Sequence, residues 1–248
     1  MSYRMLCLTA HPDDESGAFG GALLMAHNQG VETCVICLTD GAAGSFRGPA
    51  CNGEELAQLR RAEFDEAKKA LGLTHAEVLH YPDGALDGEN FQELVRLFVS
   101  KIRQHRPQVV LTFGGDGGVN LHRDHTMVSV TATAAFHWAG RSQFFPDAGE
   151  PYAPQKLYYA GTPFVSVHNS PEISKAARVP WSLAFDLGKW KEQKIAAFKL
   201  HSSQRGVLER MSDRLEEAFF TERYLLVAAR DERLLAEDDA LFAGVIDD

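Results

Sequence analysis

Residues 4–15, RMLCLTAHPDDE, begin with a short run of mostly apolar residues and end in a histidine, a proline and three acids. The run at 4–10 is typical of a buried parallel strand, which is apolar on both of its faces. The polar group HPDDE (residues 11–15) then lies where the chain leaves the carboxyl end of that strand. Ligands of open α/β folds bind at this end of the sheet. The stretch therefore predicts an α/β fold with a functional site directly after its first strand.

The first half of the chain continues to alternate between strand-like and helix-like segments. The patterns predict strands at 33–39, 76–81 and 108–113, and helices at 17–29, 54–71, 90–105 and about 124–138. Such alternation requires right-handed crossovers, so we expect a Rossmann-like, doubly wound, mainly parallel sheet with helices on both faces. If the strand order is 3-2-1-4-5, the first and fourth strands are neighbours where the order reverses.

The alternation ends at about residue 140. Six of the ten prolines fall within 141–180. Beyond residue 140 we expect strands near 156–160, 181–187 and 224–228 and a helix at 189–202. We therefore predict one domain, 1–248, with a Rossmann-like core at 1–140 and an irregular C-terminal elaboration at 141–248 that lines the substrate mouth.

The composition excludes several classes of protein. The 248 residues carry a formal net charge of −9 and are 45% apolar, as in an ordinary globular domain. A protein that binds nucleic acid through phosphates would show a basic face, so we expect no nucleic-acid partner. The N-terminus lacks a signal-peptide pattern and no apolar run reaches membrane-spanning length, which predicts a cytoplasmic protein without membrane insertion. Whether the chain forms a homo-oligomer stays open.

The four cysteines do not have the pattern of a disulfide framework. Cys7, Cys34 and Cys37 lie in apolar runs, and only Cys51 lies in a polar stretch. Cys34 and Cys37 resemble half of a zinc ribbon, but no second pair follows and positions three apart on a strand face opposite sides. Buried reduced thiols are the better interpretation.

A second polar group, HRDH (residues 122–125), follows the fourth strand and its glycine-rich loop at 114–118. If the first and fourth strands are neighbours, HPDDE and HRDH meet in one crevice. Three consecutive acids beside a histidine are electrostatically costly unless a cation lies among them. The two groups together therefore predict a metal site.

A catalytic zinc keeps three ligands drawn from His, Asp and Glu and leaves a position for water. His11, one of the two aspartates and one of the two later histidines supply that number. The aspartate that is not a ligand could accept a proton from the metal-bound water, and the remaining histidine could hydrogen-bond to a developing oxyanion.

Each group alone has a simpler explanation. In HPDDE an aspartate could cap the following helix, and the histidines of HRDH could be surface residues at a helix start. Arg60 on an amphipathic helix is most often a solvated charge, and Asp83 in Pro-Asp-Gly is first a turn former. The glycine loop at 114–118 lacks the ending of a P-loop, so we interpret it as a flexible approach to the metal site.

AHPDDE (residues 10–15) with the later His-x-Asp-His resembles the signature of the PIG-L/LmbE-like deacetylases. The resemblance extends through Thr39-Asp40-Gly41, Gly44-Ser45, Arg60-x-x-Glu63, Pro82-Asp83-Gly84 and His201-x-Ser203-Gln204. Members of this family are zinc-dependent enzymes that remove N-acetyl groups from glucosamine-containing substrates. The resemblance covers most of the chain.

The resemblance implies a role for each matching residue. The zinc ligands would be His11, Asp14 and His125, and Fe²⁺ or Co²⁺ would suit the same donors. Asp13 would be the general base, and His122 the oxyanion partner and a candidate proton donor to the leaving amine, with Asp124 tuning it. Arg60 and Asp83 match positions that contact the sugar.

Two further residues are given weaker roles. Glu15 is expected to cap or orient the loop rather than to bind the metal. His201 either has a structural role or lines the pocket.

The function implied is zinc-dependent hydrolysis of an N-acetyl or related N-acyl group from an N-acetylglucosamine-containing small molecule or glycoconjugate. The alternatives are another metal-dependent C–N hydrolase or a hydratase on the same fold, acting on a natural product or small acid. Asp13 argues against the hydratase, because that chemistry does not need this base beside the metal. A non-catalytic binding module is a third alternative.

Overall fold

The computed structural model describes residues 3–161, 183–210, 221–235 and 240–246. These residues form a seven-stranded sheet in the order β3-β2-β1-β4-β5-β7-β6. The strands are β1 (Arg4–Thr9), β2 (Glu32–Thr39), β3 (His75–Tyr81), β4 (Val109–Phe113), β5 (Lys156–Gly161), β6 (Leu183–Asp186) and β7 (Thr221–Ala229). The first five pair in parallel, whereas β7 is antiparallel to both β5 and β6. The predicted mainly parallel sheet is confirmed, and so is the order of its first five strands.

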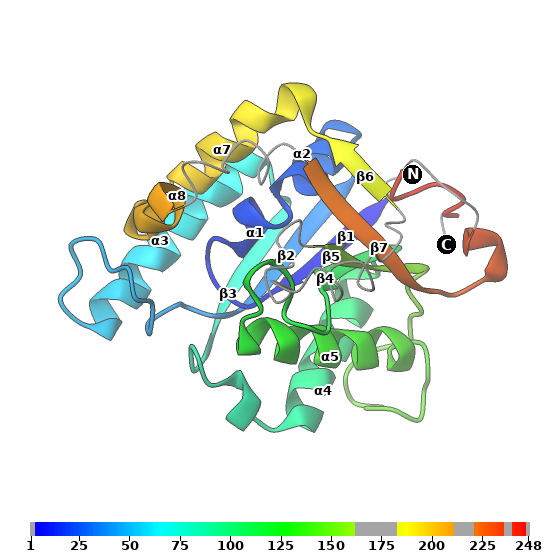
Figure 1. Ribbon diagram of the computed structural model, residues 1–248. Coiled ribbons are helices and arrows are strands. Elements are labelled where there is room, and N and C mark those ends of the chain that lie inside the picture. Colours follow the sequence, from blue (N-terminus) through cyan, green and yellow to red (C-terminus); the bar gives the residue numbers. More distant parts are fainter. Residues whose placement is uncertain (1–2, 162–182, 211–220, 236–239, 247–248) are drawn as a thin grey trace, which may run out of the picture.

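Helices cover both faces of this sheet. Figure 1 shows α4 and α5 on one face and α2, α3 and α7 on the other. The helices are α1 (Asp14–Gly17), α2 (Gly20–Asn28), α3 (Gly53–Leu71), α4 (Phe91–His105), α5 (Arg123–Trp138), α7 (Lys191–Lys199) and α8 (Arg205–Arg210). No helix within the described ranges is both long and apolar enough to cross a membrane.

The helix predicted at 17–29 begins later, as α2 at Gly20, and a separate short helix, α1, ends at Gly17. Glu222 of β7 caps the start of α2, because its carboxylate accepts hydrogen bonds from the backbone N–H groups of Gly21 (2.6 Å) and Ala22 (2.8 Å). A β-carbon at Gly21 would lie 2.8 Å from Glu222 Oε1, so the glycine makes room for the carboxylate. Lys194 of α7 neutralises the buried carboxylate at 2.6 Å.

The C-terminal half completes the same sheet. The predicted strands near 156–160, 181–187 and 224–228 correspond to β5, β6 and β7, and the predicted helix corresponds to α7. Residues 162–182, which include much of the proline-rich segment, lie outside the described residues. That 141–248 lines the substrate mouth therefore stays a prediction.

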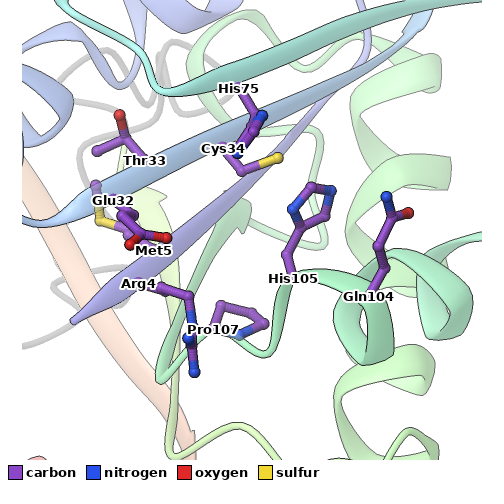
Figure 2. A pocket seen from close by; sticks show the side chains of 9 residues that line it. All are labelled: Arg4, Met5, Glu32, Thr33, Cys34, His75, Gln104, His105 and Pro107. Carbon is purple, nitrogen blue, oxygen red and sulfur yellow. The ribbon is translucent and has the colours of Figure 1, made fainter. Parts of the chain in front are cut away.

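The core contains three of the four thiols. Cys7, Cys34 and Cys37 are buried and unpaired, and Cys51 is exposed, which confirms the prediction of reduced cysteines. A cavity of about 200 Å³ lies at the amino ends of β1, β2 and β3, and Figure 2 shows the side chains that line it. The cavity lies at the opposite end of the strands from HPDDE, and none of the predicted site residues lines it.

Candidate active site

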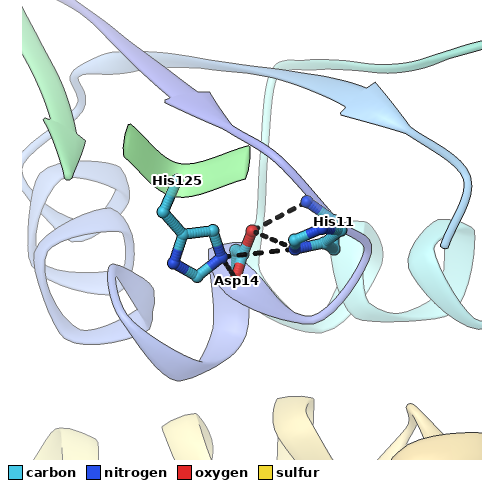
Figure 3. Close-up of side chains that lie close together, drawn as sticks. All are labelled: His11, Asp14 and His125. Atoms are coloured by element: carbon cyan, nitrogen blue, oxygen red, sulfur yellow. Dashed lines mark hydrogen bonds and ion pairs between the residues drawn. The ribbon is translucent and has the colours of Figure 1, made fainter. Parts of the chain in front are cut away.

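The two polar groups meet as predicted. β1 and β4 are neighbours, so the chain that leaves β1 lies beside the start of α5, which follows β4. His11 Nδ1 is 3.2 Å from His125 Nε2, and the same His125 nitrogen is 3.2 Å from Asp14 Oδ1. Figure 3 shows the three side chains converging from the two segments. All three are buried.

His125 is oriented by the glycine loop. Its Nδ1 lies 3.0 Å from the carbonyl oxygen of Gly117, and its ring stacks on Phe113 with centroids 3.9 Å apart. Because a carbonyl can only accept, this hydrogen bond places the ring proton on Nδ1 and leaves a lone pair on Nε2. That nitrogen is the one that faces His11 and Asp14.

His11 is oriented by two carboxylates. Its Nε2 is 3.1 Å from Asp124 Oδ2 and 3.2 Å from Asp83 Oδ1, so Nε2 carries the proton and Nδ1 faces the cluster. Burial lowers the pKa of His11, but hydrogen bonds to Asp124, Asp14 and Asp83 outweigh it and raise that pKa well above its usual value. The carboxylates therefore favour positive charge at this point.

This arrangement fits a divalent metal ion. Once His11 Nδ1 gives up its proton, it brings an electron pair into the same buried space as His125 Nε2 and a carboxylate oxygen of Asp14, and these ligand atoms lie within 4.8 Å of one another. Such lone pairs repel unless a cation lies among them. Two imidazole nitrogens and one carboxylate are also a donor set of catalytic zinc sites.

A second group of candidate ligands consists of His11, His122 and Asp124. The Asp124 carboxylate, however, also accepts from the backbone N–H groups of Gly84 (2.7 Å) and Leu86 (3.1 Å). These bonds hold the carboxylate against His11 Nε2, so we infer that Asp124 orients the His11 ring. The resemblance gave Asp124 the role of tuning His122: its side-chain hydrogen bonds go to His11 and the backbone, while its charge acts to raise the pKa of His122 against the larger effect of burial.

Asp13 lies between His11 and Asp14 in an unusual backbone conformation. Its φ of 127° is rare for a residue with a side chain, and such outliers, which cost about 1–3 kcal/mol, cluster at functional sites. Its side chain makes no helix-capping hydrogen bond, contrary to the simpler explanation of the motif. Burial raises the pKa of Asp13 to about 6, although the charge of Arg60 lowers it.

His122 stands at the start of α5 as its N-cap. Its Nδ1 accepts from the N–H of Asp124 at 3.2 Å, so the ring is neutral and its proton is on Nε2. Burial also lowers the pKa of His122. Its ring lies 4.7 Å from the ring of His11, centroid to centroid. His122 thus caps a helix and also borders the cluster of His11, Asp14 and His125.

The side chains of Arg60 and Asp83, the predicted sugar contacts, both bind other groups of the protein. The guanidinium of Arg60 lies 3.1 Å from Asp13 Oδ2 and also donates to the carbonyl of Pro12. Asp83 contacts His11 and accepts from the N–H of Ala43 at 2.8 Å. Both residues reach the site, and each supports one of its functional side chains.

One set of contacts was not foreseen. Glu15 accepts from the N–H of Asp13 at 2.9 Å, as expected for a residue that orients the loop, and its other oxygen lies 2.6 Å from His201 Nε2. Glu63 of α3 binds the two serines that follow His201. The only signal in the sequence was the shared His-x-Ser-Gln motif, which gives no partner.

The family model for GlcNAc-PI de-N-acetylase (PIG-L) matches residues 6–136, more than half of the chain. A mycothiol S-conjugate amidase of Streptomyces coelicolor is 32% identical over 177 residues, which cover 63% of this chain and 60% of the relative. A 1D-myo-inositol 2-acetamido-2-deoxy-alpha-D-glucopyranoside deacetylase of Streptomyces scabiei is 28% identical across 99% of this chain and 90% of its own length.

Among solved structures, an N,N'-diacetylchitobiose deacetylase from Pyrococcus horikoshii superposes with a TM-score of 0.75 at 21% identity, covering 91% of this chain and 84% of that one. This likeness shows the shared fold. The chain spans about 60% of the length of the first curated relatives that it matches. The family match includes both HPDDE and HRDH, and on this basis the chain belongs to the PIG-L (GlcNAc-PI de-N-acetylase) family.

Proposed function

We propose that this protein is a zinc-dependent hydrolase that removes an N-acetyl group from an N-acetylglucosamine-containing small molecule or glycoconjugate. The observation that carries the proposal is the convergence of His11, Asp14 and His125, with the Asp13 carboxylate near enough for the charges of Asp14 and His11 to shift its pKa. The names of the relatives, which describe an amidase and deacetylases of acetamido sugars, support the same class of reaction.

The metal would be held by His11 Nδ1, His125 Nε2 and a carboxylate oxygen of Asp14. A zinc ion bound there would polarise the amide carbonyl and lower the pKa of a water molecule that it binds. Asp124 and Asp83 hold the His11 ring in place, and the Gly117 carbonyl does the same for His125.

Asp13 is proposed as the general base. A carboxylate whose pKa is near 6 is ionised at neutral pH and still accepts a proton readily. It takes a proton from the water that attacks the acyl carbon. The same proton passes to the leaving nitrogen as the C–N bond breaks, so that acetate and the free amine are released.

His122 is proposed as the donor to the oxyanion. Its Nδ1 is occupied by the N–H of Asp124, so Nε2–H is free to donate a hydrogen bond to the carbonyl oxygen as charge develops there. A neutral imidazole is a poor proton donor. We therefore assign the return of the proton to Asp13, in place of the proton-donor role first suggested for His122.

The proposal is tested by measuring free acetate. The purified protein, stripped with a chelator and reloaded with Zn²⁺, Fe²⁺ or Co²⁺, is incubated with N-acetylglucosaminyl inositol, a mycothiol S-conjugate and N,N'-diacetylchitobiose. We expect acetate, or the matching amine, from at least one substrate with loaded protein and none with stripped protein. Equal rates before and after stripping, or no hydrolysis of any acylated amino sugar, would refute the proposal; hydration of an unsaturated acid would instead support the alternative.

A further inference from the structure

The backbone of Asp13 is held by a contact that the proposed reaction does not use. A φ of 127° at this residue is unfavourable by itself, so neighbouring groups must maintain it. The N–H of Asp13 donates to Glu15 Oε2 at 2.9 Å. From the other side, Arg60 donates to the carbonyl of Pro12 and pairs with the Asp13 carboxylate. The peptide unit that carries the base is thus fixed at both ends.

Glu15 is in turn held by a residue far along the chain. Glu15 is fully buried, and its Oε1 lies 2.6 Å both from Ser16 Oγ and from His201 Nε2. The side chains of Glu15 and His201 are both 0% exposed. Within the described residues, His201 Nδ1 has no hydrogen-bond partner. The polar contact made by the His201 ring is therefore directed at Glu15.

The segment that carries His201 is anchored on α3. Glu63 accepts from Ser202 Oγ (2.6 Å), from the N–H of Ser203 (2.7 Å) and from Ser203 Oγ (2.6 Å). Glu63 lies one turn after Arg60 on the same helix. The contacts thus close into a ring that runs from Asp13 through Glu15 and His201 to α3, and back through Arg60.

We propose that Glu15 and His201 are positioning residues for Asp13, holding its backbone in the conformation that directs its carboxylate toward the reacting atoms. The role of Asp13 as base rests on the function proposed above, whereas the effect of Glu15 and His201 on the Asp13 backbone does not. The C-terminal half of the chain is then part of the catalytic apparatus through His201.

Two variants at one position test this role. Glu15→Met removes both the acceptor and the buried charge, whereas Glu15→Gln keeps an oxygen that can accept from Asp13 N–H. For Glu15→Met we expect kcat to fall about tenfold or more, because small misplacements of a reacting group are costly. KM and bound metal should stay within about twofold of wild type, and Glu15→Gln should keep kcat within about threefold.

Lys194→Met is the matched control for general destabilisation. It breaks another buried ion pair, with Glu222, and this pair does not involve Asp13. We expect this variant to lower Tm and leave kcat unchanged. A second readout needs no substrate: hydrogen–deuterium exchange of the peptide covering 10–17 should accelerate in Glu15→Met and stay at the wild-type rate in Glu15→Gln and Lys194→Met.

The outcomes separate the two proposals. If wild type releases no acetate, the proposed function fails, while the exchange data still decide whether Glu15 holds Asp13. If wild type is active and Glu15→Met retains both its kcat and its exchange rate, the positioning role is wrong. An equally slow Glu15→Gln also overturns it. If Glu15→Met does not fold, His201→Leu and His201→Gln replace it, and the same difference between them is expected.

Discussion

We expect the Asp124 side chain to support the site without touching the reacting atoms. It is fully buried, and it accepts from the backbone of two residues and from Nε2 of His11. A carboxylate that accepts from one nitrogen of a metal-binding imidazole fixes the orientation of the ring and makes its other nitrogen a better electron-pair donor to the metal. Its contribution should therefore be visible in metal binding before it is visible in turnover.

We expect Asp124→Asn to weaken zinc binding about 10- to 100-fold, the range found when such supporting carboxylates are removed. The affinity is measured by competition with a chromophoric chelator. Asp87→Asn is the control, because Asp87 is an exposed aspartate paired only with the exposed Arg123 among the contacts described here. Unchanged affinity in Asp124→Asn would show that Asp83 alone holds the His11 ring.

Replacing Asp13 should have the opposite effect, because it should lower turnover and leave metal binding intact. Asp13→Ala removes the base but none of the three proposed metal ligands, so we expect kcat to fall about 10²- to 10⁴-fold with bound zinc close to one per chain. Acetate release and metal content are measured on the same preparation. Activity near the wild-type level would exclude Asp13 as the base.

The candidate site could be predicted from the sequence only as far as residue types and local spacing allow. The two groups HPDDE and HRDH contain the converging side chains, and the α/β pattern indicated that they meet. The choice between Asp13 and Asp14 as ligand came from the family resemblance. That Asp124 supports His11 and that Arg60 pairs with Asp13 depends on side-chain packing between distant segments, which spacing does not encode.

Among the local elements, the loop before α5 shows why its glycines are present. Gly117 has a φ of 96°, and a β-carbon there would come within 2.7–2.9 Å of the backbone of Leu121 and His122. Its carbonyl is the acceptor for His125 Nδ1. The loop therefore supplies the acceptor that orients the His125 ring, the proposed metal ligand, and its role as a flexible approach to the site stays a prediction.

We expect Gly117→Ala to disturb this loop and the start of α5. The strained φ and the backbone clash should cost about 2 kcal/mol, which corresponds to a decrease in Tm of about 4–8 °C in a protein of this size. Zinc affinity should fall with it. Gly115→Ala is the control in the same loop, because a β-carbon at Gly115 meets nothing within 4 Å. Equal behaviour of the two variants in thermal melts and zinc titrations would contradict the assigned role.

The bounds of helices and strands were predicted well where the apolar periodicity is regular, and less well where contacts with distant residues are made. The strong apolar stripe of α4 and the glycine that ends α3 gave boundaries close to those observed. The cap on the start of α2 comes from Glu222, about 200 residues away, so no local pattern contains this contact.

In the molecule as a whole, one sheet includes strands from both sides of the boundary predicted near residue 140. β5 pairs with β4 along five positions, and β7 and β6 extend the sheet beyond it. Glu222 of β7 caps α2, and Lys194 of α7 neutralises it. His201 reaches the loop of Asp13. Removing the C-terminal half would leave an open strand edge at β4 and an uncapped helix, so we expect 1–140 and 141–248 to unfold together.

Thermal unfolding of Lys194→Met tests this cooperativity. The variant leaves the Glu222 carboxylate without its buried cation, at a cost of about 3 kcal/mol, the low end for a broken buried pair because backbone N–H groups still bind the carboxylate. For a chain of this length that lowers Tm by about 6–12 °C. Trp138 lies in the first half and Trp181 and Trp190 lie in the second, so Trp138→Phe leaves fluorescence from the second half and the double variant Trp181→Phe/Trp190→Phe leaves it from the first. If the halves unfold as one unit, circular dichroism and both fluorescence signals shift together with a single midpoint. A shift confined to the signal that retains Trp190 would instead mean that 1–140 folds independently of the C-terminal half, which carries His201.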